Sequence, residues 1–163
     1  MSGMDGALYR TIMRHQAGAV AVIATGAPGQ RNGLTATAVC SLSDDPPTIL
    51  VCVKQTASAH DMIGHAGTFS VNLLAGDQQD MAAVFSGRTG LRGEERFTGK
   101  WTTMQSGAPV LDGALASLDC RLSERHSFAT HTIFIGSVIG GTVREEAQPL
   151  LYFRGDYWDL QNR

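Results

Sequence analysis

Residues 32–53 constrain the fold more than any other part of the chain, because they join small hydroxyl-bearing residues to a Pro-Pro step and an apolar segment. Proline removes a main-chain donor and disfavours helix in the residue before it, so Pro46 and Pro47 predict an interruption. Residues 48–53 are apolar on both faces, which is typical of a strand that is central or at a subunit interface. Small side chains before the break let a flat, phosphorylated ligand approach the backbone closely. The stretch therefore predicts a cofactor cradle.

Hydrophobic spacing predicts a mainly β structure with a few short helices. Apolar residues three to four apart predict helices over 5–16, 58–67 and 77–85, with Asp5 and Ser58 as candidate caps. Alternating or β-branched runs predict strands over residues 19–25, 34–42, 48–53, 68–74, 110–122, 131–139, 141–144 and 150–158. The first two strands are expected to form a hairpin around the turn at 26–33, and the last strand is expected to bend at Gly155.

The order of these elements favours one architecture. The helices are inserted between strands and do not alternate with them, which does not suit a doubly wound parallel sheet. An antiparallel barrel with peripheral helices fits the order better. Residues 86–100 are rich in glycine and charged residues and predict a surface loop. With 163 residues, the chain is expected to form a single domain over residues 1–163.

Composition argues against several classes of function. The formal net charge is −2 and no block of like charges occurs, so neither nucleic acid nor an anionic membrane is an expected partner. The three cysteines (Cys40, Cys52 and Cys120) are odd in number and widely spaced, and the histidines lack ligand-like partners, so we expect no disulfide framework and no metal site. No signal peptide or membrane-length apolar run is visible, and we expect a cytoplasmic protein.

Four polar residues suggest a phosphate site. Thr35 and Thr37 are two apart in a predicted strand, so their hydroxyls face the same side. Lys54 and Ser58 lie at a predicted helix start, where main-chain amides and the helix dipole attract anions. The alternative interpretation is that the threonines are ordinary exposed strand residues, that Ser58 only caps its helix and that Lys54 is solvated. The residues alone leave both interpretations open.

His131 is the best candidate for chemistry beside a heterocyclic ring, because it opens a predicted strand and could lean over a bound ligand. A structural role for a lone strand histidine is the alternative. Other common signatures are absent from the sequence: it contains no strand-linked G-x-G-x-x-G, no G-x-x-x-x-G-K-[ST] and no G-x-S-x-G. Rossmann-type dinucleotide binding, nucleoside triphosphate hydrolysis and α/β-hydrolase chemistry are therefore not expected.

The chain resembles the short-chain flavin reductases, which have the FMN-binding split-barrel fold. Residues 33–47 and 149–157 carry the most specific part of the resemblance, and further matching blocks cover 18–25, 48–53, 58–63, 69–74, 81–87, 96–97 and 131–138. The resemblance implies a mainly β fold, an antiparallel split β-barrel of the Greek-key type with peripheral helices. One departure is at residue 130, where the family often has an acid before the histidine and this chain has Thr130.

The resemblance also implies a set of flavin-binding residues. Thr35, Ala36, Thr37 and Ala38 would contact the flavin and its ribityl chain. Ser41 and Leu42 would lie along the ring, and Cys52, Val53 and Lys54 would continue that wall. Ser58 and Ala59 would help to hold the phosphate, and Phe85 would border the pocket.

By the same resemblance, the protein is expected to use NADH or NADPH to reduce FMN or FAD, with the flavin near the interface of a homodimer. Hydride would pass from nicotinamide C4 to flavin N5, and His131 would position the rings. The reduced flavin would go to a partner monooxygenase. One alternative is reduction of a corrinoid, cob(II)yrinic acid diamide, in cobalamin synthesis. A non-enzymatic alternative is a flavin storage or sensor protein.

Overall fold

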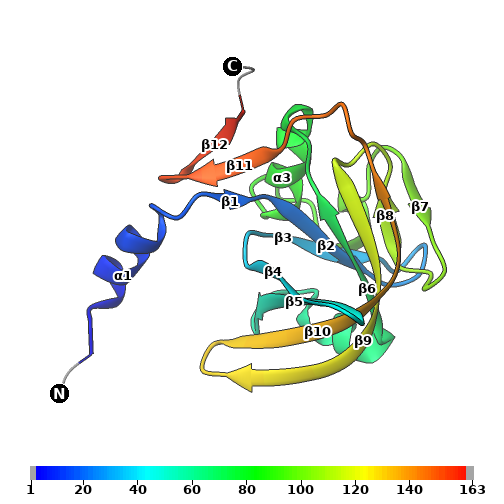
Figure 1. Cartoon of the computed structure of the whole chain (residues 1–163), viewed down its shortest axis with the longest axis horizontal. Helices are drawn as coiled ribbons and strands as arrows, with labels where there is room; N and C mark the ends of the chain where they lie inside the picture. Colours follow the sequence, from blue (N-terminus) through cyan, green and yellow to red (C-terminus); the bar gives the residue numbers. More distant parts are fainter. Residues whose placement is uncertain (1–2, 161–163) are drawn as a thin grey trace.

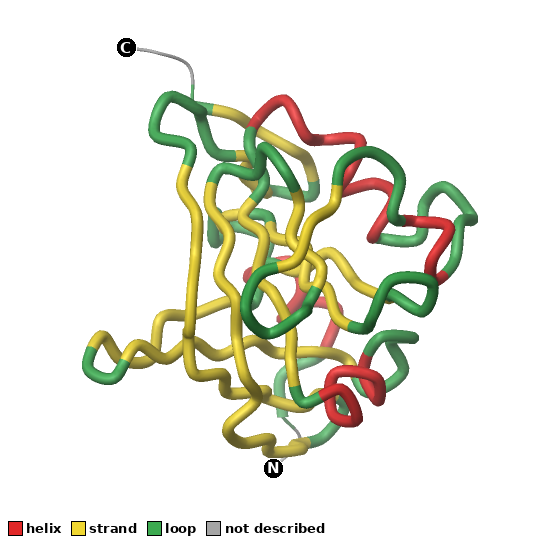
Figure 2. The backbone as a smooth tube through the Cα atoms, turned by 90° about the vertical axis from the view of Figure 1, so that its right-hand side faces the viewer, coloured by secondary structure: helices red, strands yellow, loops and turns green. Residues whose placement is uncertain are grey.

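The computed structural model describes residues 3–160 and shows strands forming the body of the molecule, with short helices around it (Figures 1 and 2). The helical elements are α1 (Gly6–Met13), α2 (His60–Ala66), α3 (Gln79–Phe85) and two 3-10 turns, η1 (Gly76–Gln78) and η2 (Gly93–Arg96). In Figure 1, α1 projects from the body beside the first strand. Within residues 3–160, no helix has both the length and the apolar character needed to cross a bilayer.

The largest sheet has seven antiparallel strands. Their spatial order is β3 (Asn32–Ala36), β2 (Ala21–Thr25), β6 (Thr68–Leu73), β9 (Ala116–Phe128), β10 (His131–Val143), β5 (Pro47–Lys54) and β4 (Val39–Asp44). β3 and β4 follow one another in sequence, yet they form the two opposite edges of this sheet. Since Thr37 and Ala38 alone connect them, and a residue spans at most ~3.6 Å, the two edges must meet there. The sheet therefore curls into a barrel that is split between β3 and β4.

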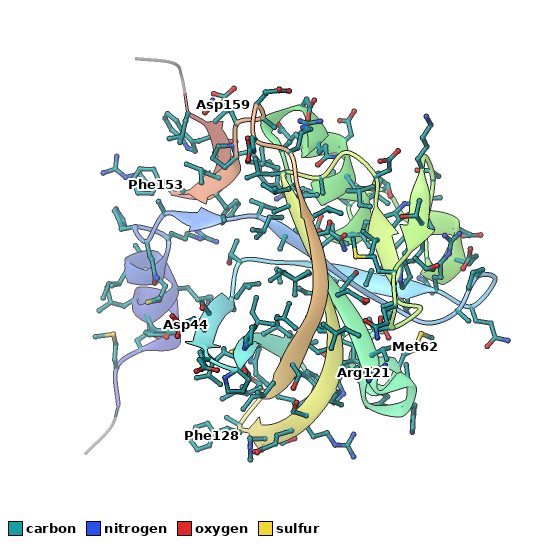
Figure 3. The ribbon with its side chains drawn as sticks, turned by 45° about the vertical axis from the view of Figure 1, so that its right-hand side comes forward. Asp44, Met62, Arg121, Phe128, Phe153 and Asp159 are labelled. Atoms are coloured by element: carbon teal, nitrogen blue, oxygen red, sulfur yellow. The ribbon has the colours of Figure 1, made fainter. Side chains whose placement is uncertain are left out.

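Two smaller sheets flank the barrel. β1 (Gly18–Ala19), β11 (Leu150–Phe153) and β12 (Asp156–Asp159) form a three-stranded sheet, and β7 (Trp101–Thr103) pairs with β8 (Pro109–Leu111). The first of these sheets lies close to α1 (Figures 1 and 3), and Figure 3 labels Phe153 of β11 and Asp159 of β12. The main-chain N–H of Arg154 donates to the carbonyl oxygen of Arg14 at 2.7 Å, and this bond holds the end of α1 against the turn between β11 and β12.

Two apolar cores lie on opposite faces of β2. Val22 and Ala24 pack with Phe85 and Leu150 in one core, whereas Ile23 belongs to the other, inside the barrel. Full burial of such side chains stabilises the fold by about 1.5–3 kcal/mol each. In the barrel core, Phe69 packs against Gly136, where an added Cβ would come within 2.6 Å of the Phe69 ring. A glycine on β10 is thus required by the close approach of β6.

Most of the predicted elements are present. Asp5 caps α1, as predicted, by accepting hydrogen bonds from the main-chain N–H groups of Ala7 and Leu8. β2 and β3 form the predicted hairpin, and a turn at Asp45–Pro46 interrupts the chain before the apolar strand β5. The prediction of a mainly β, antiparallel split barrel with peripheral helices is confirmed.

Four boundaries differ from the sequence prediction. Residues 34–42 form two strands, because the chain moves from one edge of the sheet to the other at residues 37–38. Residues 110–122 divide between β8 and β9. The two strands predicted over 131–139 and 141–144 are one strand, β10, which continues through a register shift near Gly140 and ends at Val143. The expected bend at Gly155 is a tight turn between β11 and β12, with Gly155 at φ 85°.

The predicted cap of α2 was also wrong. Ala59, and not Ser58, occupies the N-cap position, and no side chain bonds to the free amides there. The Ser58 hydroxyl instead donates to Oδ1 of Asn32 at 3.4 Å. Ser58 thus links the start of α2 to the beginning of β3.

Candidate functional site

The crossing between β3 and β4 borders a cavity of about 510 Å³. The carbonyl oxygen of Ala38 accepts a 3.0 Å hydrogen bond from the main-chain N–H of Cys52, which fixes the crossing against β5. The cavity lies between this crossing, strands β4 and β5, and the near side of α1. Its lining includes Tyr9, Met13, Thr37, Ala38, Leu50 and Cys52.

The residues of this cavity fit a flat aromatic ligand. Its volume lies in the range of ~300–1,000 Å³ that is typical of small-molecule sites. Leu50 and Tyr9 supply apolar surface, whereas Ala38 and Cys52 are small and leave the backbone accessible. A flavin ring requires this combination of apolar walls and close backbone approach. The cavity, which we call the ring cavity, is therefore the candidate flavin site.

A second cavity, of about 190 Å³, adjoins the ring cavity and shares Thr37 and Tyr152 with it. Thr35 and Ala36 of β3 line it together with Thr37 of the crossing, so both threonines border one cavity. The Thr35 hydroxyl, however, donates to the carbonyl oxygen of Ala82 at 2.8 Å, and its proton is therefore used to dock α3. We call this space the arginine cavity, because Arg88 also lines it.

Sequence reasoning missed Arg88 as a site residue. It follows α3 in the glycine-rich segment that was predicted only as a surface loop. Its guanidinium carbon lies 5.7 Å from the centre of the Tyr157 ring, which belongs to β12. Neither residue is near Thr37 in the sequence, so only the folded chain brings them together. The available signal was a cation within a few residues of a predicted helix end.

The remaining predicted phosphate residues lie elsewhere. Ser58 and Ala59 are near Asn32, at the opposite end of β3 from Thr37, and Lys54 is exposed at the end of β5. None of these three lines the ring cavity or the arginine cavity. The structure thus separates the predicted four-residue phosphate site into two places.

His131 is exposed at the start of β10, directly across from Lys54 on β5. Its Nδ1 atom lies 2.8 Å from the Thr130 hydroxyl, the residue that replaces the acid expected at this position. Ile133, two residues along β10, pairs with Cys52, and the side chains of His131 and Ile133 face the same way. His131 is two residues from Ile133, so the rise of the strand places it about 7 Å along the sheet from Cys52 and Ile133. It lies on the outer face, which carries the ring cavity.

The other predicted residues divide by exposure. Ser41 and Leu42 are exposed on β4, beyond the part that lines the ring cavity. Val53 and Ala59 are buried and line neither the ring cavity nor the arginine cavity. Phe85 is buried behind β3, where its ring leaves no room for a side chain at Gly33. Its role is to support the wall of the site from within.

An ion pair holds the long loop that follows Arg88. Arg31 donates from its main-chain N–H to Oε2 of Glu94 at 2.7 Å, and its guanidinium pairs with Oε1 of the same carboxylate. The hydrogen bond from the Arg31 side chain lowers the pKa of Glu94 below its ordinary value. Arg96 donates to the carbonyl oxygen of Gly33 at 3.1 Å. These contacts fasten the loop to β3.

Cys120 does not supply a nucleophile. Burial, and secondarily the nearby Asp119 carboxylate, raises the pKa of Cys120 to about 12, so its thiol stays protonated. Cys52 is partly exposed and contributes a small side chain to the ring cavity. The chemistry that this site can support is binding and orientation of planar ligands, with the electron transfer supplied by the ligands themselves.

Curated relatives match almost the whole chain. A protein of Stutzerimonas stutzeri named FMN reductase (NADH) RutF is 43% identical over 155 residues, which cover 94% of this chain and 88% of the relative. A protein of the same name from Methylorubrum populi is 43% identical over 158 residues, with 96% and 77% of the two chains covered.

Solved structures agree in fold. The flavin reductase PheA2 superposes with a TM-score of 0.89 at 31% identity, over 98% of this chain and 100% of that one. Streptomyces globisporus SgcE6, an NADH:FAD oxidoreductase in complex with NAD and FAD fragments, gives 0.87 at 28% identity, covering 99% and 98%. The styrene monooxygenase flavin reductase from Pseudomonas putida S12 gives 0.81 at 30% identity, covering 95% and 98%.

The family model described as "Flavin reductase like domain" matches residues 13–161. This range includes the crossing between β3 and β4, the loop with Arg88 and the hairpin that carries Tyr152 and Tyr157. Together with relatives at 43% identity, the match shows that this chain belongs to the flavin reductase-like family.

Proposed function

We propose that this protein is an NADH-dependent flavin reductase that uses FMN as its flavin. The observation that carries the proposal is the ring cavity, where the small residues Ala38 of the crossing and Cys52 of β5 lie side by side. The prediction of an NAD(P)H-dependent flavin reductase is confirmed by the family and by relatives named FMN reductase (NADH).

The flavin supplies the two-electron chemistry when bound, so this chain needs no catalytic dyad. Ala38 and Cys52 provide an accessible floor for the ring, and Leu50 with Tyr9 of α1 excludes water from its faces. His131, on the same outer face, positions the nicotinamide. Correct placement of two reactants is the main contribution that such a site makes to the rate.

The reduced flavin passes to a partner oxygenase. Support for this part of the proposal comes from the similar Pseudomonas putida protein, which is the flavin reductase of a styrene monooxygenase. The ring cavity of this chain is open to the outside at Thr37 and Ala38, which are both exposed. An open site is compatible with a flavin that binds, is reduced and leaves.

The working form of the protein is a homodimer. Helix α1 buries none of its residues, and Leu8 and Ile12 remain about half exposed at 52% and 48%. Tyr9 and Met13 line the ring cavity, whereas Leu8 and Ile12 lie on another side of the helix. A second copy would cover that apolar side, and the flavin site would then adjoin the subunit interface. The expected cytoplasmic location stays a prediction.

Anaerobic titration with NADH tests the activity. The purified protein is mixed with FMN, FAD or riboflavin, and absorbance is followed in the oxidised-flavin band, with NADPH as a parallel donor. We expect each equivalent of NADH to bleach one equivalent of FMN, with the protein needed only in catalytic amount. A flavin that binds but is not bleached by either nucleotide would contradict the proposal and indicate a storage or sensor protein. Addition of cob(II)yrinic acid diamide to the reduced mixture tests the corrinoid alternative by the cobalt(I) spectrum.

A further inference from the structure

Arg88, an exposed residue, lines the arginine cavity, and no carboxylate of residues 3–160 forms an ion pair with it. Among residues 3–160, the ion pairs join Arg31 to Glu94, Arg144 to Asp77 and two histidines to neighbouring acids, and Arg88 is in none of them. Arg88 nevertheless lines a defined cavity together with Thr37, Ser86 and two tyrosines. A guanidinium held in such a place, without an acid, is suited to an anionic ligand.

The position of Arg88 is supported from several sides. Its main-chain N–H donates to the carbonyl oxygen of Ala83 at 3.2 Å, at the end of α3. Its guanidinium lies against the Tyr157 ring. Further along the loop, Glu94 and Arg96 are bonded to Arg31 and Gly33. Because the segment is bonded to α3 on one side of Arg88 and to Arg31 and Gly33 further along, little ordering is needed when a ligand binds.

The character of the cavity points to a phosphate ester. Guanidinium N–H groups match phosphate oxygens in pairs, and the bonds are charge-assisted. The volume of about 190 Å³ is too small for a second flavin-sized ring but accommodates a phosphate with part of a sugar chain. Thr37 and Tyr152 belong to both cavities, so a ligand in the ring cavity can extend directly toward Arg88.

We propose that Arg88 binds a phosphate group of the ligand whose ring occupies the ring cavity or stacks upon it. This inference rests on the proposed function, and it adds a phosphate-recognition residue to it. The phosphate belongs to the flavin or to the nicotinamide dinucleotide, since both carry a phosphate ester a short chain away from a planar ring. Arg88 thereby distinguishes phosphorylated from unphosphorylated ligands.

The test compares ligands that carry a phosphate with ligands that lack one. Dissociation constants for FMN and riboflavin are measured anaerobically by flavin fluorescence for the wild type, Arg88→Ala and Arg88→Lys. KM is measured for NADH and for reduced nicotinamide riboside. Arg92→Ala, an exposed arginine in the same loop, is the matched control. If the phosphate is that of the flavin, Arg88→Ala weakens FMN binding about ten-fold and leaves riboflavin within about two-fold. Arg88→Lys should recover part of the loss.

If the phosphate is that of the dinucleotide, Arg88→Ala raises KM for NADH about ten-fold, and KM for the riboside and FMN binding stay unchanged. Either selective loss supports the proposal. It is overturned if no ligand is affected by more than about two-fold, if phosphorylated and unphosphorylated ligands weaken equally, or if Arg92→Ala has the same effect. A wild type that binds flavin but is never reduced by NADH contradicts the proposed function instead, and the FMN–riboflavin comparison does not depend on turnover.

Discussion

The carbonyl oxygen of Ala38 accepts a 3.0 Å hydrogen bond from the main-chain N–H of Cys52. This bond connects the crossing between the two edge strands to β5, so two small residues from separate parts of the chain line one cavity. The barrel is split at this place, and the split gives a ligand access to main-chain atoms that a continuous sheet would cover.

Filling the ring cavity should block flavin binding. Cys52→Phe adds a large ring to the ring cavity, in the space proposed for the flavin. Strand β5 should tolerate the change because Cys52 is partly exposed. We expect the Kd for FMN to rise by about ten-fold or more, equivalent to ~1.4 kcal/mol. Flavin fluorescence quenching measures the change.

Ile133→Phe is the matched control, because Ile133 pairs with Cys52 on the adjacent strand but does not line the ring cavity. Its FMN affinity should stay within about two-fold of the wild type. Equal FMN affinity for Cys52→Phe and the wild type, with thermal unfolding unchanged, would place the flavin elsewhere.

His131 should affect the nicotinamide more than the flavin. It lies on the same face as Cys52, two residues along β10 from the residue that pairs with Cys52, and it does not line the ring cavity. We expect His131→Ala to raise KM for NADH several-fold, while the Kd for FMN stays the same. Steady-state kinetics measure the effect, with His65→Ala on α2 as an exposed histidine control. Unchanged kinetics for His131→Ala would remove this residue from the site.

The parts of the fold that the sequence predicted well depend on local patterns. Asp5 caps α1 and residues 48–53 form a strand because a short segment contains the whole signal. The break at Thr37 and Ala38 has no such signal, since the strand pattern on either side is continuous. The break is present because the chain passes here from one edge of the sheet to the other. The two edges meet only after distant strands, among them β6, β9 and β10, have formed the sheet between them.

The candidate site shows the same division. Thr35 and Thr37 were predicted to face one side from their spacing alone, and both line the arginine cavity. The grouping of Ser58 and Lys54 with them assumed that residues close in sequence stay close in the fold. Arg88 could not be predicted, because its place at the site depends on packing against Tyr157 of the last strand.

The apolar side of α1 should carry the dimer. Leu8→Glu combined with Ile12→Glu places charge on two apolar residues that are about half exposed, on a helix with no buried residue. We expect a dimer that becomes monomeric at micromolar concentration, and weaker FMN binding because the interface adjoins the ring cavity. Sedimentation velocity measures the first effect. Ala7→Glu, an exposed change on the same helix, should remain dimeric. A double variant that stays dimeric would contradict this assignment of the interface.

The Glu94–Arg31 pair should give a pH-dependent contribution to stability. The pKa of Glu94 is lowered from its ordinary value of 4.5 in the folded chain, so the pair stabilises the fold above that value. Because the carboxylate is about one-third exposed, Glu94→Gln should lower Tm by only about 1–3 °C at pH 7.

The Tm difference between the wild type and Glu94→Gln should shrink as the pH falls from 4.5 through the lowered pKa of Glu94, where the wild-type carboxylate becomes protonated. Scanning calorimetry across this range measures it. Glu146→Gln changes an exposed acid that forms no ion pair within residues 3–160, and it should show no such trend. A Tm difference for Glu94→Gln that is constant from pH 7 to pH 3 would argue against the ion pair as its cause.

A crystal structure of the FMN complex would locate the flavin ring. We expect the isoalloxazine ring in the ring cavity, with atoms within about 4.5 Å of Ala38 and Cys52. Density for FMN at any other place, at a concentration that saturates binding in solution, would contradict it.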